Sequence, residues 1–172
     1  GFIQTTPIQL CLMTAQIANG GYKVYPKIVA NDNNLYADKF TPLFKKSRNV
    51  KIVQDAMFSS TNEPRGTSYR SRLNDPKYQF AGKTGTSQVK KITERDRELD
   101  LKTFEIPYEE RDHALYVAFG PYKNPRYAIS IIIEHGGSGG TVAAPLAKKL
   151  FRLIIDRHEI RKNYDNKKYL DI

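Results

Sequence analysis

The sequence is poor in several residue types that would define a function class. Its 172 residues contain one cysteine, no tryptophan and three histidines. A single cysteine excludes an internal disulfide, and Cys11, inside an apolar helical pattern, is predicted to be a small core residue. No apolar run reaches the ~20 residues that a membrane-spanning helix needs, and no signal peptide is visible. The start at Gly1, without an initiator methionine and at the edge of an apolar helix, suggests a cut chain.

Acidic residues are also scarce relative to basic ones, so the formal net charge is +10. Such a charge suits an anionic partner. However, no zinc-finger spacing, aromatic RNP-type run or basic heptad region is present, so nucleic-acid binding is not expected. Much of the excess lies between Lys148 and Lys168, and residues 158–172 are predicted to be a basic tail. The hydrophobic fraction of 40% is typical of one globular domain.

Two motifs for bound groups fail on inspection. The "GKT" triplet that ends at Thr84 suggests a phosphate loop, but the Walker pattern needs glycine where Lys77 stands. His113 and His135 flank predicted strands without a second histidine, cysteine or carboxylate at ligand spacing. No metal and no cofactor are therefore expected.

The first half of the chain predicts two helices. "TTPIQLCLMTAQIANGG" reads as a helix with a threonine cap, Pro7 in its first turn and Gly20-Gly21 at its end. Apolar residues form two stripes, so we expect this helix to be buried on two sides. The first stripe is Ile8, Cys11, Leu12, Ala15 and Ala18, and the second is Leu10, Met13 and Ile17. Residues 22–30 are expected to be extended, residues 31–49 a polar connection, and residues 50–61 an amphipathic helix that buries Val50, Val53, Ala56 and Met57.

The second half predicts three strands and a long helix. Strands are expected at 78–89, 113–120 and 127–135, the last covered on both faces, and a helix at 141–156. Short connections make neighbouring strands antiparallel. The helix tolerates Pro145 in its first turn, and its inner stripe is predicted to be Leu146, Leu150, Phe151 and Ile154. Residues 90–111 read as an exposed charged loop. The fold class is therefore α/β of the α+β type, an antiparallel sheet flanked by helices.

The run "GGSGG", residues 136 to 140, formally satisfies the nucleophile-elbow pattern G-x-S-x-G. A hydrolase built on Ser138 would need an acid and a histidine after it. The later histidine is His158, with Asp156 beside it on the same predicted helix, which does not suit a relay around a separate elbow. We interpret the run as a glycine-rich turn and keep the hydrolase as an alternative.

The stretch "KTGT", Lys83 to Thr86, carries the most chemistry. On a strand at the wall of a cleft, Lys83 would supply positive charge near a carboxylate and a hydroxyl nucleophile. Thr84 and Thr86 would hydrogen-bond a substrate carboxylate, and Gly85 would let a substrate backbone approach. A backbone N–H in this run would stabilise a developing oxyanion.

The surroundings of this stretch resemble the penicillin-binding transpeptidase domain, of the class B, penicillin-binding protein 2 type. The resemblance covers nearly the whole chain, in the expected order. It is carried by "GFIQTTPIQL" at 1–10, "EPRGTSY" at 63–69, "FAGKTGTSQV" at 80–89 and "RDHALYVAFGPYKNPRYAISIIIEHGGSGG" at 111–140.

The resemblance implies a peptidoglycan D,D-transpeptidase of the serine β-lactamase-like fold, incomplete at the N-terminus. It makes residues 1–172 the C-terminal portion of one transpeptidase domain. It implies catalytic roles for Lys83 and for the Thr86 N–H as an oxyanion donor. It also implies that Thr84, Gly85, Thr86 and Ser87 bind substrate.

The family's nucleophile motif S-x-x-K and its S-x-N motif would lie before Gly1. The matches at Ser87–Lys90 and Ser60–Asn62 are interpreted as chance. We therefore expect the isolated chain to be inactive.

The implied partners are a stem peptide ending in D-Ala-D-Ala, β-lactams, and a SEDS-type glycan polymerase with its elongation complex. The implied location is the periplasmic face of the inner membrane, with the anchor outside this chain. Two alternatives stay open. One is a catalytically dead binding or scaffold module of the same fold, and the other is a β-lactam sensor or β-lactamase relative. Whether an S-x-x-K motif exists upstream would distinguish the first alternative from an active transpeptidase.

Overall fold

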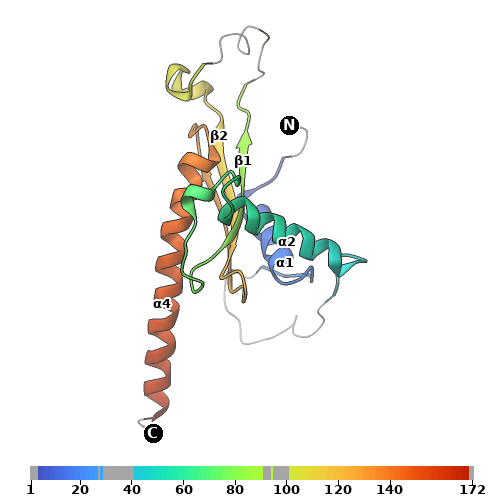
Figure 1. Cartoon of the computed structure of the whole chain (residues 1–172), viewed down its shortest axis with the longest axis vertical. Helices are drawn as coiled ribbons and strands as arrows, with labels where there is room; N and C mark the ends of the chain where they lie inside the picture. The colour runs from blue at the N-terminus through green and yellow to red at the C-terminus, as the bar shows by residue number, and fades with distance from the viewer. Residues whose placement is uncertain (1–3, 27, 29–40, 91–93, 95–100, 171–172) are drawn as a thin grey trace.

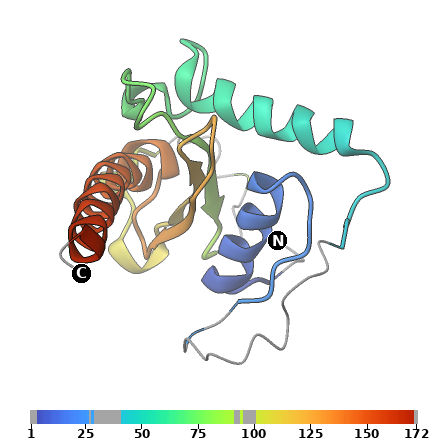
Figure 2. The same ribbon diagram turned by 90° about the horizontal axis from the view of Figure 1, so that it is seen from below.

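The computed structural model describes residues 4–26, 28, 41–90, 94 and 101–170. A three-stranded antiparallel sheet in the order β1-β2-β3 lies at its centre. Helix α1 covers one face of the sheet, α4 covers the other, and α2 runs along the β1 side (Figures 1 and 2). The predicted fold class, an antiparallel sheet flanked by helices, is confirmed.

Helix α1 (Pro7–Ala18) begins and ends as its sequence predicts. The Thr6 side chain accepts from the Gln9 N–H while the Gln9 side chain accepts from the Thr6 N–H, which closes a capping box. The predicted stripes are wrong in part, because Ile8 is 53% exposed and Met13 is 44% exposed. The fully buried position is instead Thr14, whose hydroxyl donates to a carbonyl of its own helix.

Cys11 is half-buried on α1, and its thiol donates to the Ala128 carbonyl at 3.4 Å. Burial raises the pKa of this thiol. It therefore packs against the sheet as a small, largely apolar side chain, as predicted.

Helix α2 (Ser47–Asn62) starts earlier than predicted. Val50 and Met57 are buried as expected, but Val53 and Ala56 are exposed. Only part of α2 lies against the sheet, and its first turns extend beyond it (Figure 2). Val50 in the first turn is nevertheless buried, so the predicted stripe is half right: Val50 and Met57 are covered, and Val53 and Ala56 are not.

The connection between α1 and α2 contains no regular strand in its described part. Tyr22 forms an isolated antiparallel bridge with Pro42, so the predicted extended segment at 22–30 pairs with the end of the connection. Residues 29–40 of the predicted extended and polar segments lie outside the described residues.

The strands are β1 (Ala81–Ser87), β2 (His113–Gly120) and β3 (Tyr127–Ile133). The β2 bounds match the prediction, and β1 and β3 are shorter than predicted. The register pairs Thr84 with Tyr116 on one side of β2 and Tyr116 with Ile131 on the other. Strand β3 is half-buried along its length, so it is covered less fully than its apolar sequence suggested.

Of the predicted charged loop at 90–111, the structure describes residues 90, 94 and 101–111. This part contains two short 3-10 turns, Thr103–Glu105 and Tyr108–Glu110. Its side chains are mostly exposed.

Helix α4 (Ala144–Leu170) follows a π-helical turn at Gly139–Ala143 and runs well past the predicted end at residue 156. Pro145 lies in its first turn, as predicted. The predicted inner stripe is wrong at Leu146 and Leu150, which are 37% and 39% exposed. None of the described helices combines the length and the apolar character needed to cross a membrane.

The buried face of α4 carries a small side chain near its start and large ones further along. Ala147, Phe151 and Ile155 recur every fourth residue and are buried. The alanine lets α4 approach the sheet closely, while Phe151 stacks on Phe80 with ring centroids 4.8 Å apart. Burying such a ring contributes roughly 1.5–3 kcal/mol, so this stack is a main attachment of α4 to the sheet.

Gly82 is required by the packing of Tyr116. A Cβ atom on Gly82 would lie 2.5 Å from the Tyr116 Cζ and closer still to the hydroxyl oxygen. The Tyr116 ring is fully buried and cannot move away. The sequence analysis expected Gly85 to make room for a substrate; at Gly82 the space is filled by the protein itself.

We predict that alanine destabilises the protein by unequal amounts at the two glycines of β1. Gly82→Ala should lower the free energy of unfolding by about 1–3 kcal/mol, because it overpacks a rigid core. Gly85→Ala should cost much less, because its Cβ would meet only the Leu115 Cβ, at 3.2 Å. Urea unfolding of both variants checks this, and equal losses would show that the space at Gly85 is also structural.

Candidate functional site

The outer edge of β1 carries backbone groups that point away from β2. The Asn62 side-chain amide donates to the Phe80 carbonyl at 2.9 Å from the α2 side. Backbone direction alternates along a strand, so the N–H and C=O groups of Gly82, Thr84 and Thr86 face the same edge. Within the described part of the chain, β1 is an edge strand, and the same alternation places the Thr86 N–H on the side that faces away from β2. This edge is therefore a row of backbone groups available to an added strand.

Lys83 lies at this edge with an exposed side chain. Its ammonium donates to the Thr84 carbonyl at 2.8 Å and lies 3.3 Å from the Thr84 Oγ1. No ion pair to Lys83 occurs among the described residues. The site thus presents an uncompensated positive charge beside a threonine hydroxyl.

A chain of hydroxyl groups links the edge of β1 to the end of α2. The Thr84 Oγ1 lies 3.1 Å from the Thr67 Oγ1, which lies 3.2 Å from the Ser60 Oγ. Gly66 allows this approach, because a Cβ there would lie 2.6 Å from the Ser59 carbonyl oxygen. Sequence reasoning missed Ser60 and Thr67 as site residues, although the "EPRGTSY" segment containing Thr67 had been singled out.

A second, buried set of hydroxyls supports the first. The Tyr116 hydroxyl lies 2.9 Å from both the Thr61 Oγ1 and the Ser68 Oγ, which are 3.2 Å from each other. Burial raises the pKa of Tyr116, an effect that these two hydrogen bonds only partly offset. Tyr116 therefore stays neutral and holds the end of α2 and the following turn against β2, directly opposite Thr84.

The glycine-rich turn before α4 packs directly on the strand backbones. A Cβ on Gly139 would lie 2.6 Å from the Gly85 carbonyl oxygen, and a Cβ on Gly140 would lie 2.6 Å from the Thr67 carbonyl oxygen. These glycines bring the start of α4 against the site. These glycines are needed because a side chain at either position would collide with backbone atoms. This agrees with the prediction that "GGSGG" is a glycine-rich turn.

The geometry gives no support to a hydrolase on Ser138. Ser138 precedes the first turn of α4, whereas His158 lies far along the helix, where its ring contacts Tyr127. At ~1.5 Å per residue, His158 is about 20 Å from the start of the helix at Ala144. The two side chains cannot share a proton.

The internal matches to S-x-x-K and S-x-N are held in other roles. Ser87 ends β1, and the Lys90 ammonium pairs with the Glu110 carboxylate at 2.6 Å. Lys90 follows in a bend, so Ser87 and Lys90 do not lie one helical turn apart on a helix. The Asn62 amide is bonded to the Phe58 and Phe80 carbonyls.

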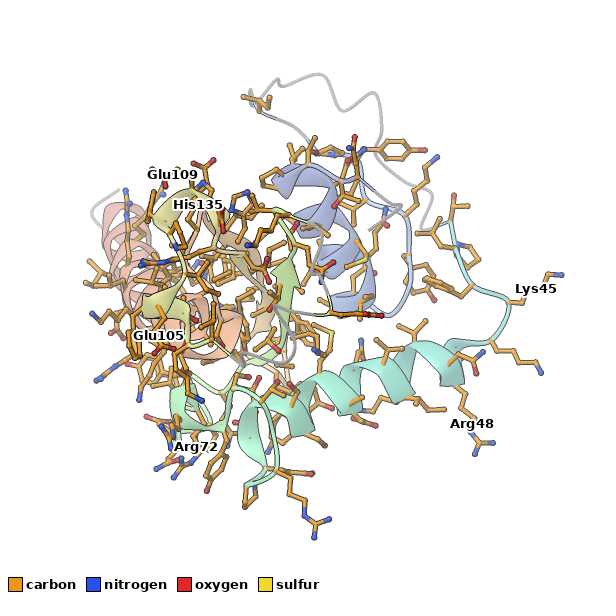
Figure 3. All side chains as sticks on the ribbon, turned by 90° about the horizontal axis from the view of Figure 1, so that it is seen from above. Lys45, Arg48, Arg72, Glu105, Glu109 and His135 are labelled. Carbon is orange, nitrogen blue, oxygen red and sulfur yellow. The ribbon has the colours of Figure 1, made fainter. Side chains whose placement is uncertain are left out.

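One pairing escaped the sequence analysis, which found no partner for His113 or His135. The two ring centroids lie 4.8 Å apart, and the backbone N–H of His135 donates to the Nδ1 atom of the His113 ring at 2.9 Å. His135 has a positive φ of 54° at the turn after β3 and sits at the Tyr108–Glu110 end of the molecule (Figure 3). A pair still falls short of a metal site, and the described residues contain no cluster of three or more His, Cys, Asp or Glu side chains fit to hold a metal ion.

Comparison with known proteins identifies the family. The model of the penicillin binding protein transpeptidase domain matches residues 1–152. The chain belongs to this family. It is 35% identical over 164 residues to the peptidoglycan D,D-transpeptidase MrdA of Salmonella typhimurium strain LT2, across 91% of this chain and 26% of that protein. It is 31% identical over 160 residues to MrdA of Haemophilus influenzae, across 87% and 24%.

Solved structures agree with this family. The crystal structure of Pseudomonas aeruginosa PBP2 in complex with WCK 5153 matches with a TM-score of 0.67 and 33% identity, over 86% of this chain and 30% of that one. Helicobacter pylori PBP2 in its complex with MreC matches with a TM-score of 0.66 and 29% identity, over 87% and 25%. The resemblance to penicillin-binding protein 2 is confirmed. The chain spans about a quarter of the length of the curated relatives it matches.

The two hydroxyl groupings should differ in their contribution to stability. Tyr116→Phe removes the shared partner of two buried hydroxyls and should lower the free energy of unfolding by about 1 kcal/mol. Thr84→Val removes a hydroxyl from the exposed chain and should change it by less than about 0.5 kcal/mol. Chemical unfolding of the two variants tests this, and a large loss in Thr84→Val would make the exposed chain a structural feature instead of a ligand surface.

Proposed function

We propose that this transpeptidase-family chain is the C-terminal part of a peptidoglycan D,D-transpeptidase, an acyltransferase that cross-links stem peptides through a serine acyl-enzyme. The observation that carries the proposal is the outer edge of β1. There the Thr84 and Thr86 backbone groups point outward beside the Lys83 ammonium and the Thr84 hydroxyl. Residues 1–172 form one portion of a single domain in this proposal.

The stem peptide lies along this edge as an added antiparallel strand, held by main-chain hydrogen bonds. Gly85 lets its backbone approach, and the hydroxyls of Thr84, Thr86 and Ser87 hold its terminal carboxylate. Lys83 contributes positive charge beside the nucleophile. The Thr86 N–H donates to the oxygen that becomes negative in the transition state.

The reaction has two steps. A serine of an S-x-x-K motif, in a segment outside these 172 residues, attacks the carbonyl of the penultimate D-Ala. An ester bond forms, the amide bond to the terminal D-Ala breaks, and D-Ala leaves with the proton. The amine of a neighbouring stem peptide then attacks the ester, so that a new amide forms and the serine hydroxyl is restored.

The proposal also assigns location and partners. The intact protein acts at the periplasmic face of the inner membrane, held by an anchor outside these residues, and β-lactams acylate the same serine. A SEDS-type glycan polymerase and other proteins of the elongation complex are its partners. The solved complex of Helicobacter pylori PBP2 with MreC supports an assembly of this kind.

We predict that these 172 residues alone form no acyl-enzyme. Intact-mass measurement after exposure to benzylpenicillin should show no added mass on the isolated chain. The full-length protein should gain the mass of one drug molecule. A mass gain on Ser60, Ser87 or Ser138 of the isolated chain would contradict both the assignment of the nucleophile and the proposal.

The role of Lys83 is tested in the full-length protein. Lys83→Ala should slow acylation by roughly 10²–10⁴-fold, the range of a lost acid–base or electrostatic group. The matched control is Lys123→Ala, an exposed lysine in the turn between β2 and β3, which should acylate at the normal rate. Equal rates in the two variants would remove Lys83 from the mechanism.

A further inference from the structure

A basic pocket lies beside the hydroxyl chain and is not used by the mechanism above. Its volume is about 500 Å³. One wall is the 3-10 turn Tyr69–Ser71, the other is the first part of α4, and the π-helical turn at Gly139–Ala143 lies between them. The α4 helix and the segment before β1 lie side by side in both ribbon views (Figures 1 and 2).

The side chains that line this pocket are strongly positive. Arg70, Lys148, Lys149 and Arg152 contribute to it, and no aspartate or glutamate does. Cations held this close repel one another, and an anion would relieve that repulsion.

Nearby carboxylates compensate only one of these cations. The pKa of Asp156, one turn beyond Arg152, is lowered first by the Tyr78 hydroxyl, then by Lys77, and also by the charge of Arg152. Among the described residues, no ion pair involves Arg70, Lys148 or Lys149. The pocket therefore keeps a net positive charge.

The pocket lies next to the hydroxyl chain at the edge of β1. Gly140 lines the pocket, and a Cβ on Gly140 would lie 2.6 Å from the Thr67 carbonyl oxygen and 3.6 Å from the Thr84 Cγ2. Thr67 and Thr84 belong to the exposed hydroxyl chain. One residue, Gly140, therefore separates the pocket from the place where a peptide along β1 would bind.

From this proximity and charge we propose that the pocket binds a side-chain carboxylate of a stem peptide. This inference rests on the proposed function and deepens it, because it names a charge preference for the substrate. Arginine and lysine side chains supply several donors to a carboxylate. A volume of about 500 Å³ lies in the range of small-ligand pockets, so the pocket is large enough to admit a whole acidic side chain.

The test uses the full-length protein and two D-Ala-D-Ala peptides that differ only in one internal side-chain carboxylate, free or amidated. The wild type should acylate with the acidic peptide roughly tenfold more efficiently, as kcat/KM, since one charge-assisted contact has about that value. Arg70→Gln combined with Lys148→Gln should abolish this preference. The charge-matched control, Lys45→Gln with Arg48→Gln at the far end of α2 (Figure 3), should retain it.

Two peptides take part in the reaction, and the steps distinguish them. Loss of preference in acyl-enzyme formation assigns the pocket to the peptide that is cleaved. Loss confined to the aminolysis step, measured with acidic and amidated amines, assigns it to the peptide that attacks. An unchanged preference in both steps of the Arg70→Gln/Lys148→Gln protein overturns the proposal.

Acylation by benzylpenicillin separates this failure from failure of the proposed function. A full-length wild type that gains no drug mass and releases no D-Ala refutes transpeptidation itself. A wild type and a double variant that are both acylated, with equal preference for the acidic peptide, refute only the pocket.

Discussion

The packing of Tyr116 against Gly82 is the constraint on which the rest of the structure depends. The ring occupies the space that a side chain at Gly82 would need, and its hydroxyl bonds Thr61 and Ser68. One residue therefore joins β2, β1, the end of α2 and the turn that follows it. Because the hydroxyl is buried and fully paired, moving any of these parts would leave a buried polar group without a partner.

Close backbone approaches then place the site. Gly66 lets the turn return against α2, and Gly139 and Gly140 let the start of α4 lie on the backbones of β1, β2 and the turn at Thr67. In each case a side chain would meet backbone atoms, which cannot rotate away. The exposed hydroxyl chain and the basic pocket are consequences of these contacts, because both lie where the turn, β1 and α4 converge.

The arrangement divides polar groups by burial. The buried hydroxyl group around Tyr116, which includes Thr61 and Ser68, faces inward and stabilises the fold. The exposed side chains at the edge of β1, such as Thr84 and Lys83, face outward with few protein partners. Ligand-binding groups need this division, since a group already satisfied inside the protein gains little from a substrate. The rigid inner set holds the outer set in position for a peptide that adds to the sheet edge.

The amino-acid sequence by itself determined the local features of this protein. The threonine cap, the bounds of β2 and the glycine turn followed from residue chemistry and order along the chain. Periodicity misassigned Leu146 and Leu150 as the inner face of α4, because an apolar pattern does not say which apolar side the sheet will cover. It also gave Val53 and Ala56 to the core, although the first turns of α2 lie beyond the sheet.

Only the tertiary structure decided which distant residues meet. No spacing in the sequence brings Ser60 to Thr84 through Thr67, pairs His113 with His135, or places Arg70 opposite Lys148. It also supplied the reason for Gly82, because a side chain there would occupy the space of the Tyr116 ring. The physical reason is the same throughout: local propensity depends on neighbours in the chain, whereas a site depends on which surfaces pack together.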